Sequence, residues 1–213
     1  MVVKIMHALV IGGTGLVGVE LLRLLASDTE FSRIDSVGRS IVPDLQDRVH
    51  QVVMDLLEES LPANVTPDVV FCCLGTTIRT AGSQEAFRRV DYEMPMRIAK
   101  AARTRGAQHF ILVSSLGANP ASRTFYSRIK GELERDLQKL GYPSLTFVRP
   151  SLLLGDRTEP RFGEQVATLV MLTFRLLIPR SLRAISATRV AAAMVAAAKR
   201  RRVGVEVIEN RVL

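Results

Sequence analysis

The sequence is poor in the side chains from which disulfide frameworks and metal sites are built. It has no tryptophan, 5% aromatic residues, three histidines and two cysteines among 213 residues. Cys72 and Cys73 are adjacent, so a disulfide between them would be strained, and we expect a reducing compartment, the cytoplasm. His7, His50 and His109 lie far apart without the spacing of metal ligands, which predicts structural roles and no metal.

Long apolar runs and flexible linkers are absent as well. The most apolar late stretch, residues 166–179, is short for a membrane span and is interrupted by Arg175. No signal peptide is visible, because residues 1–4 lead directly into the first expected strand. We therefore predict no membrane span and one domain over residues 1–213.

Basic residues outnumber acidic ones, 29 to 21, which gives a net charge of +8 and a pI of about 10.2. The main basic run is Lys-Arg-Arg-Arg at residues 199–202. It lies where a helix is expected to end, and cations there complement the helix dipole. No aromatic residue interleaves with the run, so we expect a solvated helix end and no nucleic-acid partner. The alternative, nucleic-acid binding, rests on charge alone.

Three spaced glycines predict a phosphate-binding turn near the N-terminus. Gly12, Gly15 and Gly18 follow the apolar run at residues 7–11 and open an apolar segment that reads as a helix. Glycine lets the backbone approach a pyrophosphate, and the helix N-terminus presents free N–H groups and the positive end of its dipole. A glycine motif alone is weak, but the strand before it and the helix after it give the context of a dinucleotide site.

Short apolar runs alternate with helical segments along the chain. Strands are expected at residues 4–11, 33–37, 50–53, 68–73, 109–113, 144–148 and 204–208. Helices are expected at residues 16–26, 83–105, 123–140 and 189–201. This alternation predicts an α/β protein with a doubly wound Rossmann fold and a parallel sheet. The less regular residues 152–185 are expected to cover the carboxyl ends of the strands, where a substrate pocket forms.

The end of the second expected strand bears on the choice of cofactor. An NAD-selective site usually has an acid there, whereas this strand ends in Gly38 and Arg39. An arginine can pair with a 2′-phosphate, so NADP(H) is favoured over NAD(H); the alternative is that Arg39 is a solvated loop residue. Asp55, after the third strand, either binds the adenine amino group or caps its turn. After the fourth strand, the small residues within 73–77 would let the backbone pass beside the cofactor.

Tyr126 and Lys130 have the i, i+4 spacing that places two side chains on one face of a helix. Upstream, Ser114 and Ser115 end the fifth expected strand. In carbonyl reduction a tyrosine hydroxyl donates the proton, a lysine ammonium stabilises the phenolate, and a serine hydroxyl polarises the carbonyl. The pair alone is weak, but its order after the glycine turn and the serine-bearing strand end favours a reductase of this type.

Together these motifs resemble the short-chain dehydrogenase/reductase superfamily, in its atypical, compact branch, over nearly the whole chain. Within that branch the chain looks most similar to the subgroup of the Tat-interactive oxidoreductase homologue and its bacterial NAD(P)H-binding relatives. The stretches that carry the resemblance are residues 72–77, 114–118, 126–132 and 149–157. The resemblance implies a Rossmann fold that binds NADPH.

By matched position the resemblance also implies residue roles. Tyr126 and Lys130 would be catalytic and would touch the nicotinamide ribose, with Ser115 as the acting serine and Ser114 as the fallback. The pyrophosphate would be lined by Thr14, Gly15, Leu16 and Val17, within the turn formed by Gly12 and Gly18. The 2′-phosphate would be bound by Arg39 and Ser40, and the nicotinamide ribose would be flanked by Leu74 and Gly75. Leu153 would cover the nicotinamide end, and Arg161 would reach back toward the phosphates. Asp55 stays a candidate cofactor contact on the argument given above.

The chain departs from the superfamily after the fourth strand, where residues 73–75, Cys-Leu-Gly, replace an Asn-Ala-Gly signature. The asparagine that supports the proton relay in many members has no assignable counterpart. The leading hypothesis is an NADP(H)-dependent oxidoreductase that reduces a small carbonyl compound; the alternative is an NADPH-binding regulatory or redox-sensing protein with little turnover. A nucleotide-sugar epimerase is disfavoured because the region after Pro150 is short. Helices 83–105 and 123–140 are candidates for pairing subunits in a homodimer.

Overall fold

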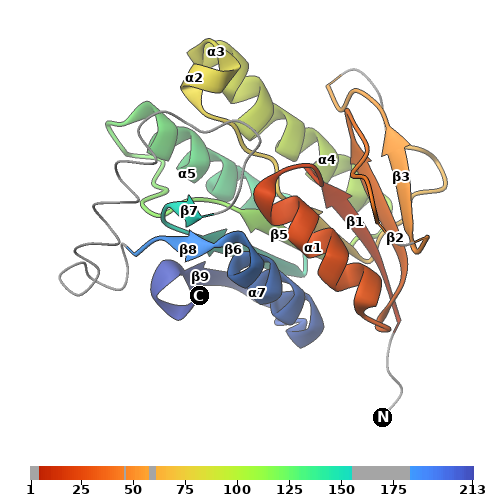
Figure 1. Cartoon of the computed structure of the whole chain (residues 1–213). Coiled ribbons are helices and arrows are strands. Elements are labelled where there is room, and N and C mark those ends of the chain that lie inside the picture. Colours follow the sequence, from red (N-terminus) through yellow and green to blue (C-terminus); the bar gives the residue numbers. More distant parts are fainter. Residues whose placement is uncertain (1–4, 46, 58–60, 155–182) are drawn as a thin grey trace.

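The computed structural model describes residues 5–45, 47–57, 61–154 and 183–213. Within them, parallel strands form one sheet in the order β3-β2-β1-β4-β5-β6-β9 (Figure 1). The Rossmann fold and the parallel sheet are confirmed. The strands are β1 (Met6–Ile11), β2 (Phe31–Gly38), β3 (Val49–Val53), β4 (Val69–Cys72), β5 (His109–Val113), β6 (Ser144–Arg149) and β9 (Gly204–Glu209).

The central strands are apolar on both faces because helices cover both sides of the sheet. In β1, Ala8 and Val10 pack toward α1 (Leu16–Ser27) and α7 (Ala187–Arg200), whereas Leu9 and Ile11 pack toward α4 (Met94–Thr104) and α5 (Phe125–Gln138). Figure 1 shows these two helix pairs on opposite faces of the sheet. The strand order reverses between β1 and β4, so the loops that follow these two strands diverge and leave a crevice for a ligand.

The prediction of one regular helix at residues 83–105 is wrong. The chain forms α2 (Ile78–Ala81), α3 (Gln84–Arg88), a π-helical segment η1 (Arg89–Glu93) and then α4. Pro95 explains the wider turn. It has no N–H to donate to the carbonyl of Asp91, four residues earlier, and its ring would clash with that carbonyl in a regular α-helix.

Residues beyond β6 contribute a second, small sheet, in which β7 (Leu153–Leu154) pairs in parallel with β8 (Ile185–Ser186). Most of the predicted covering segment, residues 155–182, lies outside the described residues. The chain ends with β9 at the sheet edge and the short 3-10 helix η3 (Asn210–Val212). None of the described helices has the length and the apolar character that a membrane crossing requires.

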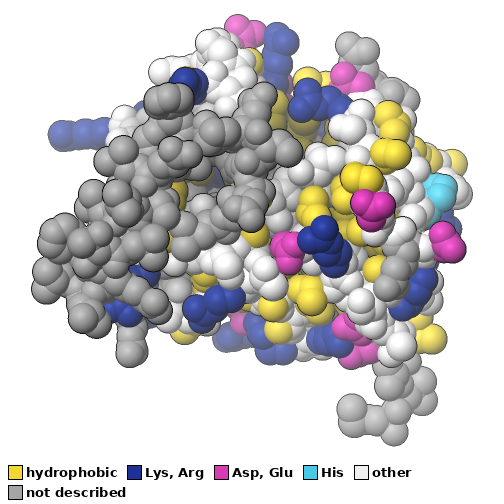
Figure 2. Space-filling model, viewed as in Figure 1, with side chains coloured by type: hydrophobic (Ala, Val, Ile, Leu, Met, Phe, Trp, Pro, Cys, Tyr) yellow, Lys and Arg dark blue, Asp and Glu magenta, His cyan; other side chains and the backbone are white. Residues whose placement is uncertain are grey.

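Basic side chains are spread over the face seen in Figure 2, where acidic side chains lie among them. At the end of α7, Lys199 forms ion pairs with Asp28 at 2.5 Å and Glu30 at 2.8 Å, and Arg200 pairs with Glu206 at 3.0 Å. Lys199 and Arg200 of the basic run at 199–202 are therefore engaged with carboxylates of the same chain.

Candidate dinucleotide and catalytic site

The glycine turn after β1 is packed so closely that two of its glycines cannot carry a side chain. Gly12 has φ +80°, and a Cβ there would lie 2.8 Å from the backbone nitrogen of Leu74. A Cβ on Gly18 would lie 2.8 Å from the Cα of Gly13. Gly15 is different: it is exposed, caps α1, and would place a Cβ no closer than 3.4 Å from its neighbours. Gly12 and Gly18 shape the turn, and Gly15 offers the open backbone.

The remaining predicted pyrophosphate contacts lie at the start of α1. Thr14 is exposed and Leu16 is half-buried, whereas the side chain of Val17 is buried in the core. Val17 can therefore meet a phosphate only through its backbone. Because the helix begins here with no side-chain cap, its first N–H groups are available to an anion.

A pocket opens beside this turn, at the tip of β2. Arg39 and Ser40 line it together with Ser36, and no carboxylate is among its described lining residues. Its apolar wall was not predicted from the sequence and comes from Leu56, Val90 and Met94. No local motif marks these three residues, because they reach the pocket from a loop, η1 and α4.

Of the two roles that the sequence left open for Asp55, the structure shows the cap of its turn. Its Oδ1 accepts a hydrogen bond from the backbone N–H of Leu57 at 2.8 Å. The pocket wall at this point is Leu56. The capping alternative has a direct observation behind it, and an adenine contact by Asp55 stays a prediction.

The predicted Tyr126 and Lys130 lie on α5, one turn apart. Tyr126 is 37% exposed and its ring packs on that of Phe87, with the centroids 5.6 Å apart. Lys130 is 3% exposed, and its Nζ lies 2.8 Å from Oδ1 of Asp91 in η1. Burial disfavours the ammonium, but Asp91 and then Tyr126 act in the opposite direction, and the net effect raises the pKa of Lys130 above its ordinary value.

The loop after β4 comes close to this pair. Leu74 is half-buried and lines the pocket at the tip of β2, and Gly75 is exposed. A Cβ on Gly75 would lie 3.7 Å from Oδ1 of Asp91 and 3.9 Å from Nζ of Lys130. The structure therefore brings Gly75 and Lys130 together, as expected for two residues assigned to the same ribose.

The two serines at the end of β5 have different surroundings. Ser114 donates a hydrogen bond of 2.5 Å to Oε1 of the buried Glu134, which also accepts hydrogen bonds from Arg149 at 2.5 and 3.0 Å. Ser115 is 8% exposed, and its hydroxyl has no hydrogen-bond partner among the described residues. The hydroxyl of Ser114 is thus bonded within the protein, whereas none of the described residues bonds the buried hydroxyl of Ser115.

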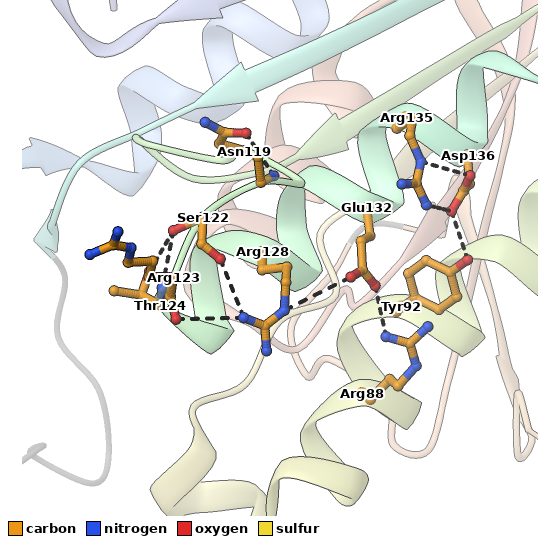
Figure 3. A network of polar contacts seen from close by, with 11 residues as sticks. Arg88, Tyr92, Asn119, Ser122, Arg123, Thr124, Arg128, Glu132, Arg135 and Asp136 are labelled. Atoms are coloured by element: carbon orange, nitrogen blue, oxygen red, sulfur yellow. Dashed lines mark hydrogen bonds and ion pairs between the residues drawn. The ribbon is translucent and has the colours of Figure 1, made fainter.

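A polar network on the outer side of α5 fixes the helix against η1 and the preceding loop (Figure 3). Arg88 binds Glu132 at 2.9 Å and stacks on the ring of Tyr92, whose hydroxyl donates to Asp136 at 2.9 Å. Hydrogen bonding to Arg135, and then to Lys139 and Tyr92, outweighs partial burial and lowers the pKa of the Asp136 carboxyl. The network holds the helix that carries Tyr126 and Lys130.

Two predicted cofactor contacts have little or no described geometry. Leu153 is half-buried at the start of β7, and Arg161 lies outside the described residues. The histidines have structural contacts: His7 and His50 both bind the buried Asp35, the latter at 2.9 Å, and His109 bonds Thr146 at 2.9 Å. The described residues contain no cluster of three or more potential ligands suited to a metal ion.

Comparison with known proteins identifies relatives over most of the chain. The profile of the "NAD dependent epimerase/dehydratase family" matches residues 8–177. Protein FMP52, mitochondrial, of Eremothecium gossypii is 38% identical over 170 residues, which are 78% of this chain and 75% of that protein. Protein HTATIP2 of Rattus norvegicus is 38% identical over 163 residues, 74% of this chain and 67% of that protein.

Solved structures show the same fold at low sequence identity. MoeE5 in complex with UDP-glucose and NAD superposes with a TM-score of 0.74 at 17% identity, over 94% of this chain and 74% of that one. A UDP-N-acetylglucosamine 4-epimerase from Methanobrevibacter ruminantium gives a TM-score of 0.72 at 15% identity, over 97% of this chain and 77% of that one. These matches support the fold.

The expected cytoplasmic location is contradicted by these relatives. The FMP52 proteins of several fungi, including Saccharomyces cerevisiae at 34% identity, are named mitochondrial. The prediction rested on two adjacent cysteines and on the start of the sequence. Reduced cysteines indicate only that a compartment is reducing, so they cannot single out the cytoplasm.

Proposed function

Because the chain belongs to the NAD dependent epimerase/dehydratase family, we propose that it is an oxidoreductase that binds NADP(H) and reduces a small carbonyl compound. One observation carries the proposal. Lys130, on the same face of α5 as Tyr126, lies close to Gly75 at the carboxyl edge of the sheet, where the loop after β4 meets the glycine turn. This arrangement supports a role for Tyr126 as proton donor and for Lys130 as a buried cation beside the predicted dinucleotide site.

The tip of β2 supports the preference for NADP(H). Arg39 is exposed and lines the pocket, and Ser40 lies next to it. The one acid on β2, Asp35, is fully buried among His7, Arg33 and His50, well before the strand tip. A 2′-phosphate would meet a guanidinium here, and the described residues that line the pocket include no carboxylate to repel it.

The residues of the chain divide the chemistry between them. When bound, the reduced nicotinamide supplies a hydride. The hydroxyl of Ser115, which has no partner in the part of the chain that the structure describes, can donate a hydrogen bond to the substrate carbonyl and so favour the alkoxide that develops there. The hydroxyl of Tyr126 donates the proton, and the Lys130 ammonium stabilises the phenolate that remains.

Calorimetric titration with NADPH and with NADH tests the cofactor assignment. Arg39→Ala should weaken NADPH binding by about 1–3 kcal/mol and leave NADH binding nearly unchanged, because only NADPH carries the 2′-phosphate. Arg23→Ala, in an exposed side chain of α1 that pairs with Glu20, is the matched control and should change neither affinity. Equal affinities of the wild type for both nucleotides would refute the preference for NADP(H), and no binding of either would refute the proposed function.

A second candidate is an NADPH-binding regulatory protein with little turnover. It is supported by the Cys-Leu-Gly sequence at residues 73–75, which departs from the superfamily signature. Tyr126→Phe separates the two candidates. A reductase should lose turnover in this variant and keep NADPH affinity, whereas a regulatory protein should show no reduction in the wild type and bind a partner only when NADPH is present.

A further inference from the structure

A buried carboxylate stands beside the proposed catalytic lysine, and neither the sequence motifs nor the proposed function has used it. Asp91 is 0% exposed. Its Oδ1 lies 2.8 Å from Nζ of Lys130, and its Oδ2 accepts a hydrogen bond of 2.9 Å from the backbone N–H of Thr76. One side chain thus joins the lysine of α5 to the loop that is expected to carry the nicotinamide ribose.

The backbone at Asp91 is adapted to this contact. Asp91 is the central residue of the π-helical segment η1, which follows α3 and precedes α4. π-Helical turns are costly and occur frequently at functional sites. Here the turn is enforced by Pro95, and it places a carboxylate, with no solvent contact, between Lys130 and the loop after β4.

Among the described ionisable groups with the largest effects on Lys130, Asp91 is the only carboxylate. The other two are Tyr126 on the same helix and Cys72 on β4. Burial raises the pKa of the Cys72 thiol to about 11, so it is neutral at physiological pH. The Tyr126 hydroxyl is the proton donor of the proposed reaction. The charge that balances the buried ammonium therefore comes from Asp91.

We propose that Asp91 is a positioning residue, whose carboxylate holds the Lys130 ammonium in its charged form beside Gly75 and Thr76, where the proposed reaction needs it. A fully buried ammonium without a counter-ion tends to lose its proton. A neutral lysine would no longer stabilise the Tyr126 phenolate. This inference rests on the proposed function for its purpose, whereas the contact between Asp91 and Lys130 stands on the geometry alone.

Lysine titration by NMR tests the proposal without cofactor or substrate. The chain has only five lysines, so 13C labelling at Cε gives five signals, and Lys130→Arg identifies that of Lys130. In Asp91→Asn the Lys130 signal should titrate at least about 2 pH units lower than in the wild type. A carboxylate that served only to accept the Thr76 N–H would not move this signal.

Asp28→Asn is the matched control. It also changes a lysine-paired carboxylate to an amide, but at the opposite end of the strands, where Asp28 binds Lys199 at 2.5 Å. It should shift Lys199 and leave Lys130 unchanged. An unchanged Lys130 midpoint in Asp91→Asn would overturn the proposal.

If Asp91→Asn does not fold, the double variant Asp91→Asn, Lys130→Met decides. Recovery of folding would show that the defect was the unpaired ammonium, whereas continued unfolding would assign Asp91 a structural role and overturn the proposal. The titration uses the protein without NADPH, so its outcome is separate from that of the proposed function. If NADPH does not bind but the Lys130 signal shifts in Asp91→Asn, the proposed function is refuted and the inference about Asp91 stands. If NADPH binds but the Lys130 signal does not shift, the inference about Asp91 is refuted and the proposed function stands.

Discussion

Gly18→Ala gives a sharp test of how the glycine turn is built. Gly18 lies in α1, where alanine is favoured over glycine by about 1 kcal/mol in a helix without other contacts. The new Cβ would, however, lie 2.8 Å from the Cα of Gly13 and 2.9 Å from the carbonyl carbon of Gly12. These are backbone atoms, so no rotamer change relieves the clash, and overpacking of this kind costs typically about 1–3 kcal/mol and occasionally more. We expect a net loss of about 2 kcal/mol in the free energy of unfolding, at the upper end of these costs.

The assay is urea unfolding followed by circular dichroism at a helix wavelength, since the chain has no tryptophan to report by fluorescence. Gly15→Ala is the matched control. Its Cβ comes no closer than 3.4 Å to a neighbour, so only an N-cap cost of about 1 kcal/mol or less is expected. Both variants should weaken NADPH binding. If Gly18→Ala is as stable as the wild type, the packing argument for this glycine is wrong.

Two further predictions concern buried polar side chains. Burial and the charge of Arg200 lower the pKa of His109 to about 4. Between pH 4 and 6.5 the unfolded chain therefore binds more protons than the folded one, and the free energy of unfolding falls as the pH drops through this range. His109→Gln should reduce the slope of stability against pH by up to one proton, which is about 1.4 kcal/mol per pH unit. Urea unfolding at several pH values measures this slope, and parallel curves of stability against pH for wild type and variant would contradict the prediction. Glu134→Gln should destabilise the fold by about 3 kcal/mol because Arg149 loses a buried partner, whereas Glu209→Gln, at a half-exposed partner of the same arginine, should cost below about 1 kcal/mol. Equal losses in these two variants would show that burial does not set the strength of these pairs.

The local patterns of the sequence predicted the elements well where packing is simple. The strand at residues 109–113 is observed with the same ends, because a short apolar run suits a central strand that is buried on both faces. The glycine turn and the Tyr126–Lys130 spacing were likewise readable, since each is a local signature. The helix at residues 83–105 was predicted as regular. A helix can respond to a proline such as Pro95 with a kink, an end or a wider turn, and the local sequence does not distinguish between them.

The partners of the site residues could not be predicted, because they come from distant parts of the chain. Asp91 meets Lys130 across 39 positions in sequence, and Ser114 meets Glu134 across 20. No periodicity or motif records such a contact; it arises only when η1 and β5 are both packed against α5. The choice between Ser114 and Ser115 illustrates the point, since two adjacent serines look alike until Glu134 is seen to occupy one of them.

The buried charges around α5 are better explained by position than by stability. Lys130 pairs with Asp91 of η1, and one turn later Glu134 pairs with Arg149 of β6. Burying such pairs costs desolvation energy that their attraction often fails to exceed, so apolar side chains of similar size would serve the core at least as well. An ion pair is nevertheless directional, and two pairs to different elements restrict both the rotation and the shift of the helix. Tyr126 lies one turn before Lys130, on the helix that is held in this way.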